Sequence, residues 1–264
     1  MSRKLGPLET AAISFAQMRN LRTLHAGQLV SGLRISSKQE RELLSRMSRS
    51  GLIAKVRKGL YLIPPKLPLG GIWTPDEATA IKALMADKNA RYQITGPKAF
   101  NRYGFSAQLA SLTTIYNDAI SGERRIGSVA LKLIKVARDR LGGVEKVFTP
   151  GGVALIYSSR VRTLVDAVYD WSLFDSLPEA YDWIRADIVS GRVATDELAR
   201  ATVRFGNVGT IRRIGVILDR LGAGKPTLTR LERAVKPTTA KIPLVPTRPA
   251  RGLVAKRWGV VING

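Results

Sequence analysis

The stretch SSKQERELLSRMSRSGLIAKVRKGLYLIPP, residues 36–65, predicts a helix followed by a β-hairpin. In its first half, Ser37 and Glu40 have the spacing of a capping box, in which each side chain accepts a hydrogen bond from the other residue's backbone amide. At about 100° per residue, three apolar residues share one face of this helix, and most of its cations lie elsewhere. The three are Leu43, Leu44 and Met47. The helix is therefore expected to bury one side and to expose a basic one.

The second half of the stretch places a basic turn between two short apolar runs. Residues 52–56 and 60–63 are predicted strands, and Gly59 can adopt the positive φ that a tight turn requires. A double proline then ends the second strand. Arg57 and Lys58 put two positive charges into the turn, which a plain surface hairpin does not need.

Two further helices are predicted upstream, over residues 8–18 and 23–33, from apolar residues at helical spacing. Three helices followed by a hairpin is the order of a winged helix-turn-helix, whose third helix enters the major groove while the hairpin, or wing, contacts the DNA backbone or minor groove. We therefore predict an α+β protein. A winged helix-turn-helix domain would span residues 1–66, and a larger mixed α/β domain would span residues 67–264.

Net charge points to a polyanionic partner. The 264 residues contain 43 Lys and Arg against 20 Asp and Glu, a formal charge of +23. Residues 1–66 hold 13 cations and 3 acids, and residues 221–264 hold 9 and 1, whereas the middle is close to balanced, with 21 and 16. A uniformly basic surface would not be distributed in this way. Nucleic acid is favoured over an anionic membrane surface.

No segment of the sequence is typical of membrane insertion or export. No apolar run reaches the roughly 18 residues of a spanning helix. The first residues lack the apolar core and cleavage site of a signal peptide, and the chain has no cysteine for a disulfide framework. We expect a cytoplasmic protein with no membrane partner.

Ten residues of the predicted winged helix-turn-helix are candidate DNA contacts. A helix N-terminus attracts phosphate, arginine is the best reader of guanine, and cations on the wing add affinity without sequence choice. The candidates are Arg34, Ser36, Ser37, Lys38, Arg41, Ser45, Arg49, Lys55, Arg57 and Lys58.

Later segments are predicted to contain strands and then helices. The β-rich runs are residues 113–117, 129–136 and 153–158. Ser159 is expected to cap a helix over residues 160–171, in which Arg162 and Asp166 would form a solvated i, i+4 ion pair. Helices dominate residues 176–220.

Two segments are expected to be largely irregular. Proline and glycine density places a domain boundary near residues 66–72, before a helix with Thr74 as N-cap and Pro75 in its first turn. Residues 223–251 are rich in Pro, Thr and cations, which is typical of an extended arm that tracks phosphates. An ordered crossover leading to a terminal strand around Trp258 is the alternative.

No catalytic, metal or cofactor site is expected. His25, the sole histidine, has no partner at catalytic spacing and is predicted to be partly buried. One histidine and no cysteine leave no zinc cluster. GAGKP at residues 222–226 lacks the spacing and the hydroxyl of a phosphate loop. Gly127-Ser128 lacks the paired aspartates of a nucleotidyltransferase.

Segments along nearly the whole chain resemble the AbiEi-type antitoxins, the transcriptional-regulator half of type IV toxin–antitoxin (abortive infection) operons. They are GLIAKVRKGLYLIPP (51–65), YQITGPKAFNRYGF (92–105), SSRVRTLVDAVYD (158–170), TIRRIGVILDRLG (210–222) and IPLVPTRPARGLVAKRWGVVING (242–264). The resemblance implies a DNA-binding N-terminal domain that represses its own operon. It also implies a C-terminal domain that counteracts a nucleotidyltransferase-like toxin encoded alongside.

The partners expected on this basis are double-stranded operator DNA upstream of its own operon and a cognate toxin. A homodimer, or cooperative binding, would place two half-sites about one helical turn apart. Two alternatives stay open from the residues. One is a nucleic-acid-processing enzyme or RNA-binding factor whose basic ends hold the substrate. The other is an antitoxin that acts through protein contacts alone.

Overall fold

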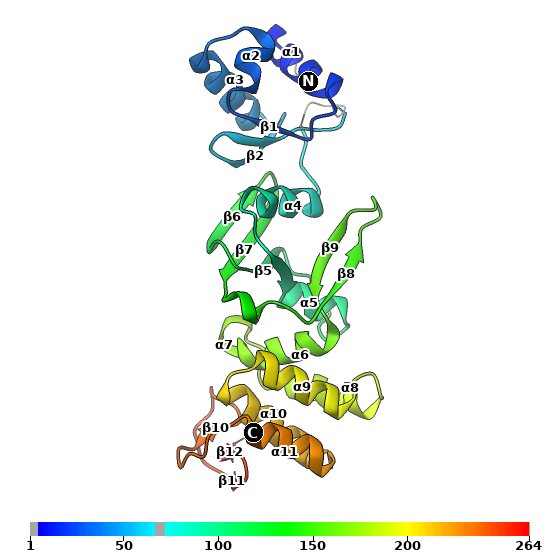
Figure 1. Cartoon of the computed structure of the whole chain (residues 1–264), viewed down its shortest axis with the longest axis vertical. Coiled ribbons are helices and arrows are strands. Elements are labelled where there is room, and N and C mark those ends of the chain that lie inside the picture. Colours follow the sequence, from blue (N-terminus) through cyan, green and yellow to red (C-terminus); the bar gives the residue numbers. More distant parts are fainter. Residues whose placement is uncertain (1–4, 67–71, 264) are drawn as a thin grey trace. The chain divides into compact units, whose positions relative to one another are not determined.

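The computed structural model describes residues 5–66 and 72–263, and Figure 1 shows the order of its elements. The helices are α1 Pro7–Met18, α2 Gln28–Leu33, α3 Ser37–Arg49, α4 Glu77–Asp87, α5 Pro97–Arg102, α6 Arg160–Tyr169, α7 Trp171–Phe174, α8 Glu179–Val189, α9 Thr195–Phe205, α10 Val208–Arg220 and α11 Lys225–Arg233, with a 3-10 turn at Arg138–Arg140. The strands are β1 Thr23–His25, β2 Ala54–Arg57, β3 Leu60–Leu62, β4 Tyr92–Thr95, β5 Leu112–Asn117, β6 Gly122–Ile126, β7 Val129–Lys135, β8 Val144–Phe148, β9 Ala154–Ser158, β10 Ile242–Pro243, β11 Leu253–Ala255 and β12 Val260–Ile262.

The strands form three sheets. The small N-terminal sheet has the order β1-β3-β2, a mixed six-stranded sheet has the order β6-β7-β5-β4-β9-β8, and a small C-terminal sheet has the order β10-β12-β11. In the six-stranded sheet β6 pairs with β7 antiparallel, whereas β4 pairs with β9 parallel. The predicted α+β fold class is confirmed.

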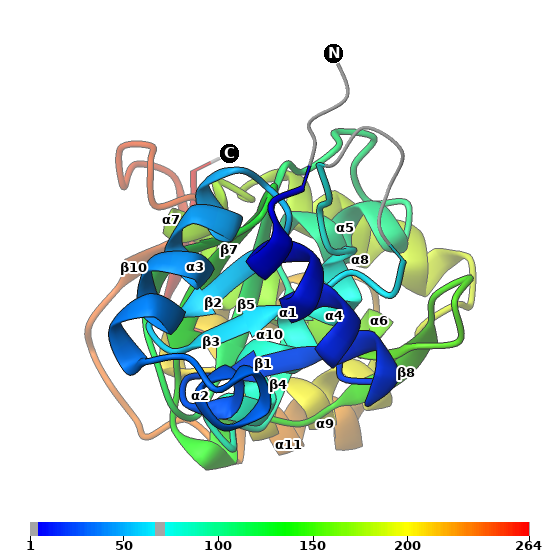
Figure 2. The ribbon, with the colours of Figure 1, turned by 90° about the horizontal axis from the view of Figure 1, so that it is seen from above.

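The N-terminal elements follow the order α1-β1-α2-α3-β2-β3, and in Figure 2 the three helices lie over the strands. Strands β2 and β3 form the predicted antiparallel hairpin, and β1 adds a third strand on the far side of β3. The helices and strands share one apolar core, which includes Ile13 of α1, Leu29 of α2 and Met47 of α3. This is the arrangement of a winged helix-turn-helix, with α3 in the position of the recognition helix.

The predicted second helix was wrong at its start. Thr23–His25 is a strand whose residues pair with Leu62, Tyr61 and Leu60 of β3, so α2 begins only at Gln28. Gly27, with a φ of +95°, makes the turn between them. His25 is exposed at the end of this strand instead of being partly buried in a helix.

The capping box of α3 lies one residue earlier than predicted. Ser36 accepts a hydrogen bond from the Gln39 amide at 3.2 Å, and the Gln39 side chain accepts one from the Ser36 amide at 2.8 Å. Glu40 is instead buried, and its carboxylate accepts hydrogen bonds from the amides of Gly27 and Leu29 at 2.7 and 2.8 Å. Glu40 thus caps the N-terminus of α2 and ties that helix to α3.

Close contact between α1 and α2 depends on Gly32. A Cβ added at Gly32 would lie 2.0 Å from the ring of Phe15, which no relaxed structure permits. We expect Gly32→Ala to lower the free energy of unfolding of the N-terminal elements by about 1–3 kcal/mol, because the ring must leave its site. Chemical denaturation would measure the loss, with the neighbouring exposed substitution Ser31→Ala as a control. Equal stability of the two variants would contradict this account of the packing.

The predicted start of the next helix was also shifted. Asp76, not Thr74, is the N-cap of α4, and it accepts a hydrogen bond from the Thr79 amide at 2.8 Å. The domain boundary expected near residues 66–72 falls mainly on residues 67–71, which lie outside the described residues.

By its internal contacts the chain divides into two compact units. The first comprises Met1–Tyr92, Asn117–Val136 and Phe148–Leu155, and the second comprises Gln93–Tyr116, Ala137–Val147 and Ile156–Gly264. Helices α6, α8, α9, α10 and α11 share the core of the second unit, and Trp258 packs into it. Within the described ranges, no helix has the length and apolar character needed to cross a membrane.

Most later elements agree with the predictions, and the tail is the exception. The three β-rich runs correspond to β5, β7 and β9, and Ser159 caps α6. The tail, however, is not an extended arm throughout. It begins with α11, whose Leu228 and Leu231 are buried in the core, and continues to the short strand β10. The alternative of an ordered crossover is closer to the structure.

Candidate nucleic-acid interface

Helix α3 presents a basic face to solvent. Lys38, Arg41, Ser45 and Arg49 are all exposed, and at about 100° per residue they fall within one quadrant of the helix. Leu43, Leu44 and Met47 are buried on the opposite side. From Lys38 to Arg49 this face is roughly 16 Å long, at about 1.5 Å per residue. A helix about 10–12 Å across with its side chains fits a major groove about 12 Å wide.

The turn before α3 adds further candidates. Arg34 ends α2 in the left-handed conformation, with a φ of +54°, and its side chain is exposed. Ser36 and Ser37 are exposed at the start of α3, and the Ser36 hydroxyl already accepts from the Gln39 amide. The first amides of a helix point outward along its axis and suit an anion.

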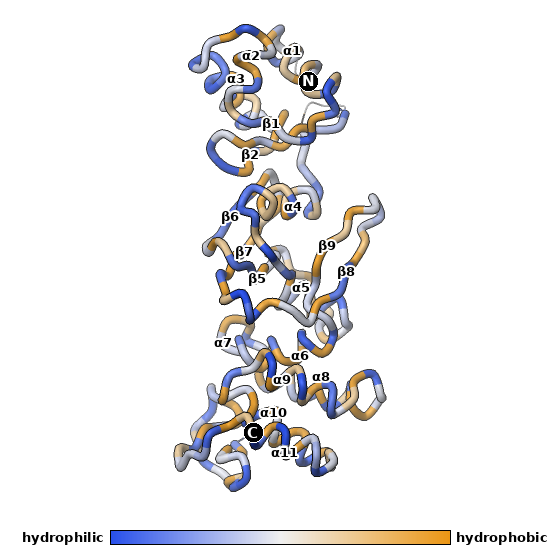
Figure 3. The backbone as a smooth tube through the Cα atoms, in the orientation of Figure 1, coloured by the Kyte–Doolittle hydropathy of each residue, from blue (hydrophilic) through white to orange (hydrophobic). Residues whose placement is uncertain are grey.

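The hairpin carries its predicted cations on the solvent side. In β2, Ala54 and Val56 are buried, while Lys55 and Arg57 are exposed. Lys58 is exposed in the turn, and Gly59 follows with a φ of +78°. This turn is coloured as hydrophilic in Figure 3. All ten candidate DNA contacts are therefore exposed, and they lie on α3, on the turn before it and on the wing.

Arg57 differs from the other candidates because it has a carboxylate partner. Its guanidinium contacts Asp87, the last residue of α4, with Nε 2.8 Å from each carboxylate oxygen and Nη2 2.5 Å from Oδ1. These hydrogen bonds hold the pKa of the Asp87 carboxyl below its usual value. Five other arginines and lysines of the candidate set lie on α3 and the wing. Among the described residues they have no ion-pair partner: Lys38, Arg41, Arg49, Lys55 and Lys58.

Three residues of this region have roles that the sequence analysis did not predict. Glu40 holds α2 against α3, and Asp87 binds Arg57. Arg46, which also lies on α3, pairs with the buried Glu9 of α1 at 3.2 Å, although its own side chain is 52% exposed. The basic character of α3 alone does not separate Arg46 from the neighbouring cations that have no ion pair among the described residues.

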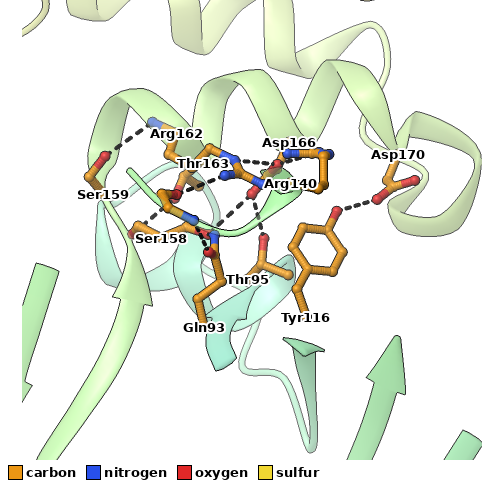
Figure 4. A network of polar contacts seen from close by, with 11 residues as sticks. Gln93, Thr95, Tyr116, Arg140, Ser158, Ser159, Arg162, Thr163, Asp166 and Asp170 are labelled. Carbon is orange, nitrogen blue, oxygen red and sulfur yellow. Dashed lines mark hydrogen bonds and ion pairs between the residues drawn. The ribbon is translucent and has the colours of Figure 1, made fainter. Parts of the chain in front are cut away.

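A second polar cluster lies inside the second unit and is drawn in Figure 4. At its centre Asp166 Oδ1 accepts from Arg162 Nε and from Arg140 Nη2, both at 2.8 Å. Its Oδ2 accepts from the hydroxyls of Thr95 and Ser158 at 3.0 and 3.1 Å. The side chains of Arg162 and Asp166 are fully buried, so the expected solvated ion pair was wrong.

This buried cluster has the features of a structural network. Arg162 and Arg140 are balanced by Asp166 and Asp170, and Tyr116 donates a hydrogen bond to Asp170. Burial raises the pKa of Tyr116 and of Asp170 and lowers that of Arg162. Two nitrogens, Arg140 Nη1 and Arg162 Nη2, have no hydrogen-bond partner. The network joins strands of the sheet to α6.

No family model matches the chain, and no curated protein matches it. The fold is similar to that in the crystal structure of the RV2827C protein from Mycobacterium tuberculosis. The TM-score is 0.60, and the match covers 98% of this chain and 92% of that chain at 14% sequence identity. At this identity the likeness concerns the fold.

Proposed function

We propose that this protein is a DNA-binding repressor that acts as the antitoxin of a toxin–antitoxin operon. Helix α3 would enter the major groove with Lys38, Arg41 and Arg49 facing bases or phosphates. The wing would place Lys55 and Lys58 along the neighbouring backbone. The protein would work in the cytoplasm without catalytic activity, metal or cofactor.

One observation carries the proposal. A winged helix-turn-helix exposes a basic face on its third helix while the opposite face of that helix is buried. The exposed cations of α3 and the wing could neutralise about five phosphates, and such contacts supply most of the affinity of a protein for duplex DNA. Any surface helix exposes polar residues opposite its apolar face, so the proposal depends on the gathering of cations on the third helix of a winged helix-turn-helix, the helix that enters the major groove in that fold.

The antitoxin role rests on the resemblance of the sequence segments to the AbiEi-type antitoxins. By that analogy the operator lies upstream of the protein's own operon, and the C-terminal domain predicted over residues 67–264 counteracts a nucleotidyltransferase-like toxin. A neighbouring reading frame with a Gly-Ser motif and paired aspartates would support this part of the proposal.

A mobility-shift titration of the full chain tests the DNA-binding part. The probes are the duplex upstream of the operon and a scrambled duplex of equal length, each at several salt concentrations. We expect preference for the upstream duplex and a slope of log K against log salt of about −4.5, at about −0.9 for each of about five phosphates contacted. Equal affinity for both duplexes, or no binding, would contradict the repressor.

The alternative of an RNA-binding factor or nucleic-acid-processing enzyme rests on the same basic surface. An RNA-binding factor would prefer single-stranded or folded RNA over the upstream duplex. An enzyme would shorten the probe when magnesium is added. Both arms run beside the duplex titration, so each outcome assigns the surface to one class of ligand.

A further inference from the structure

The turn of the wing is held by a residue distant in sequence. Asp87, at the end of α4, has a side chain that is 5% exposed, and both of its oxygens face Arg57. Arg57 Nη1 also donates to the carbonyl oxygen of Lys58 at 2.8 Å. One guanidinium therefore links a nearly buried carboxylate to the backbone of the residue at the tip of the wing.

A second contact fixes the same turn from the other side. The amide of Ala26, just after β1, donates to the Gly59 carbonyl oxygen at 2.9 Å. The register of the hairpin shifts between Lys55 and Arg57, which marks a β-bulge, and bulges re-aim the side chains beside them. The tip of the wing is thus anchored to α4 through Arg57 and to the end of β1 through Gly59.

The three cations of the wing differ in whether a carboxylate already neutralises their charge. Asp87 already neutralises Arg57, and Lys88 approaches the same carboxylate at 3.2 Å. For Arg57 to contact a phosphate, it would have to give up three hydrogen bonds to Asp87 and leave that nearly buried carboxylate with Lys88 as its ion-pair partner, which is costly. Lys55 and Lys58 are exposed, and among the described residues neither has an ion pair that must break before it can reach DNA.

We propose that Arg57 and Asp87 form a clamp that sets the conformation of the wing, and that Lys58 and Lys55, not Arg57, contact phosphate. This inference rests on the proposed DNA-binding function. Arg57 and Asp87 are then positioning residues. They contribute to affinity by holding the turn in its binding conformation before DNA arrives, which removes an ordering cost from binding.

A double-mutant cycle separates a clamp from a direct phosphate contact. The variants are Arg57→Ala, Asp87→Ala and the double variant, which keeps the wild-type net charge. We expect each single variant to bind the upstream duplex about 5- to 10-fold more weakly, and the double variant to lose no more than either. The salt slope should stay at its wild-type value in all three, whereas Lys58→Ala should reduce it by about one.

The opposite pattern would overturn the clamp. If Arg57 is a phosphate contact that Asp87 holds back, Arg57→Ala lowers the salt slope by about one, and Asp87→Ala strengthens binding because it frees the cation. Unchanged affinity in both single variants would also overturn it, since the turn would then need no clamp.

Hydrogen exchange without DNA keeps this test independent of the proposed function. In the clamp model the amides of residues 58–60 exchange faster in Arg57→Ala and Asp87→Ala than in the wild type, and Lys58→Ala leaves them unchanged. Exchange that is unaltered in all variants would overturn the clamp. If the wild type fails to bind duplex DNA while the exchange rates change as expected, the proposed function fails and the clamp stands.

Discussion

Asp166→Ala should lower the free energy of unfolding of the second unit by about 3–5 kcal/mol, the usual loss when one partner of a buried ion pair is removed. The aspartate accepts from four donors, two of them on the guanidinium groups of Arg162 and Arg140. Without it, Asp170 has to balance both arginines of the network, which leaves one positive charge inside the protein uncompensated. Since each arginine already has one nitrogen without a partner, the network holds no spare acceptor to replace the carboxylate.

The chain offers a matched control on another helix. Asp182 and Arg185 on α8 form an Arg–Asp pair at 2.6 Å, but their side chains are 70% and 44% exposed. Asp182→Ala should change stability by less than about 1 kcal/mol, because water and salt screen such a pair. Denaturant unfolding followed by fluorescence reports on this unit, which contains Trp171, Trp183 and Trp258. Similar midpoints for the two variants would contradict a stabilising role of the buried network.

Asp166→Asn covers the case in which the alanine variant does not fold. The amide keeps an oxygen that the guanidiniums can contact, and the hydroxyls of Thr95 and Ser158 can rotate to accept from its nitrogen. The missing charge is not replaced. We therefore expect a loss of stability between those of the wild type and the alanine variant, whereas wild-type stability would show that the charge is not needed.

Local sequence signals were sufficient for α3 and for the wing. The apolar spacing of Leu43, Leu44 and Met47 fixed the buried face, and Gly59 marked the turn. Local sequence signals were insufficient where two capping boxes were possible at the start of α3. Ser36-Gln39 and Ser37-Glu40 have the same spacing, and the structure selects the first because Glu40 is required by the amides at the start of α2.

Partners that are distant in sequence account for most of the remaining differences. The strand β1 has three residues, and it forms because β3 pairs with it. The local pattern of residues 23–25 does not predict this pairing. The ion pair between Arg57 and Asp87 joins residues 30 apart. Burial of the Arg162–Asp166 pair arises from other elements, including Phe205 of α9, whose ring lies 4.2 Å from the Arg162 guanidinium carbon.

The prediction for the tail was wrong for a different reason. A local signal for a helix was present, but the composition of the whole segment was given more weight. Gly224-Lys225-Pro226 starts α11 with proline in the first turn, a common position for proline in helices. The high content of proline and threonine over residues 223–251 favoured an extended segment instead. Leu228 and Leu231, three residues apart, are the apolar face that anchors this helix.

Reversing the charge of α3 should remove specific DNA binding. In the variant Lys38→Glu, Arg41→Glu and Arg49→Glu, each substitution replaces an attraction to the duplex with a repulsion. At about 1–3 kcal/mol per contact, affinity for the upstream duplex should fall by at least about 100-fold. All three side chains are exposed, so the fold should be retained, with a cost below about 1 kcal/mol from the acid placed in the last turn of the helix.

A control variant with the same change in net charge separates the effect of the α3 face from the effect of the protein's overall positive charge. Lys82→Glu, Lys146→Glu and Arg185→Glu change the net charge by the same amount at exposed positions outside the winged helix-turn-helix. Long-range attraction to DNA is screened beyond about 10 Å at 0.1 M salt, so this control should retain most of its affinity there. If the two triple variants lose affinity equally, binding depends on total charge, and α3 is not the recognition helix. If a large loss of DNA affinity is confined to the α3 variant, the position of these cations matters more than the total charge. The buried face of α3 then serves to orient the cations of its other face toward the groove.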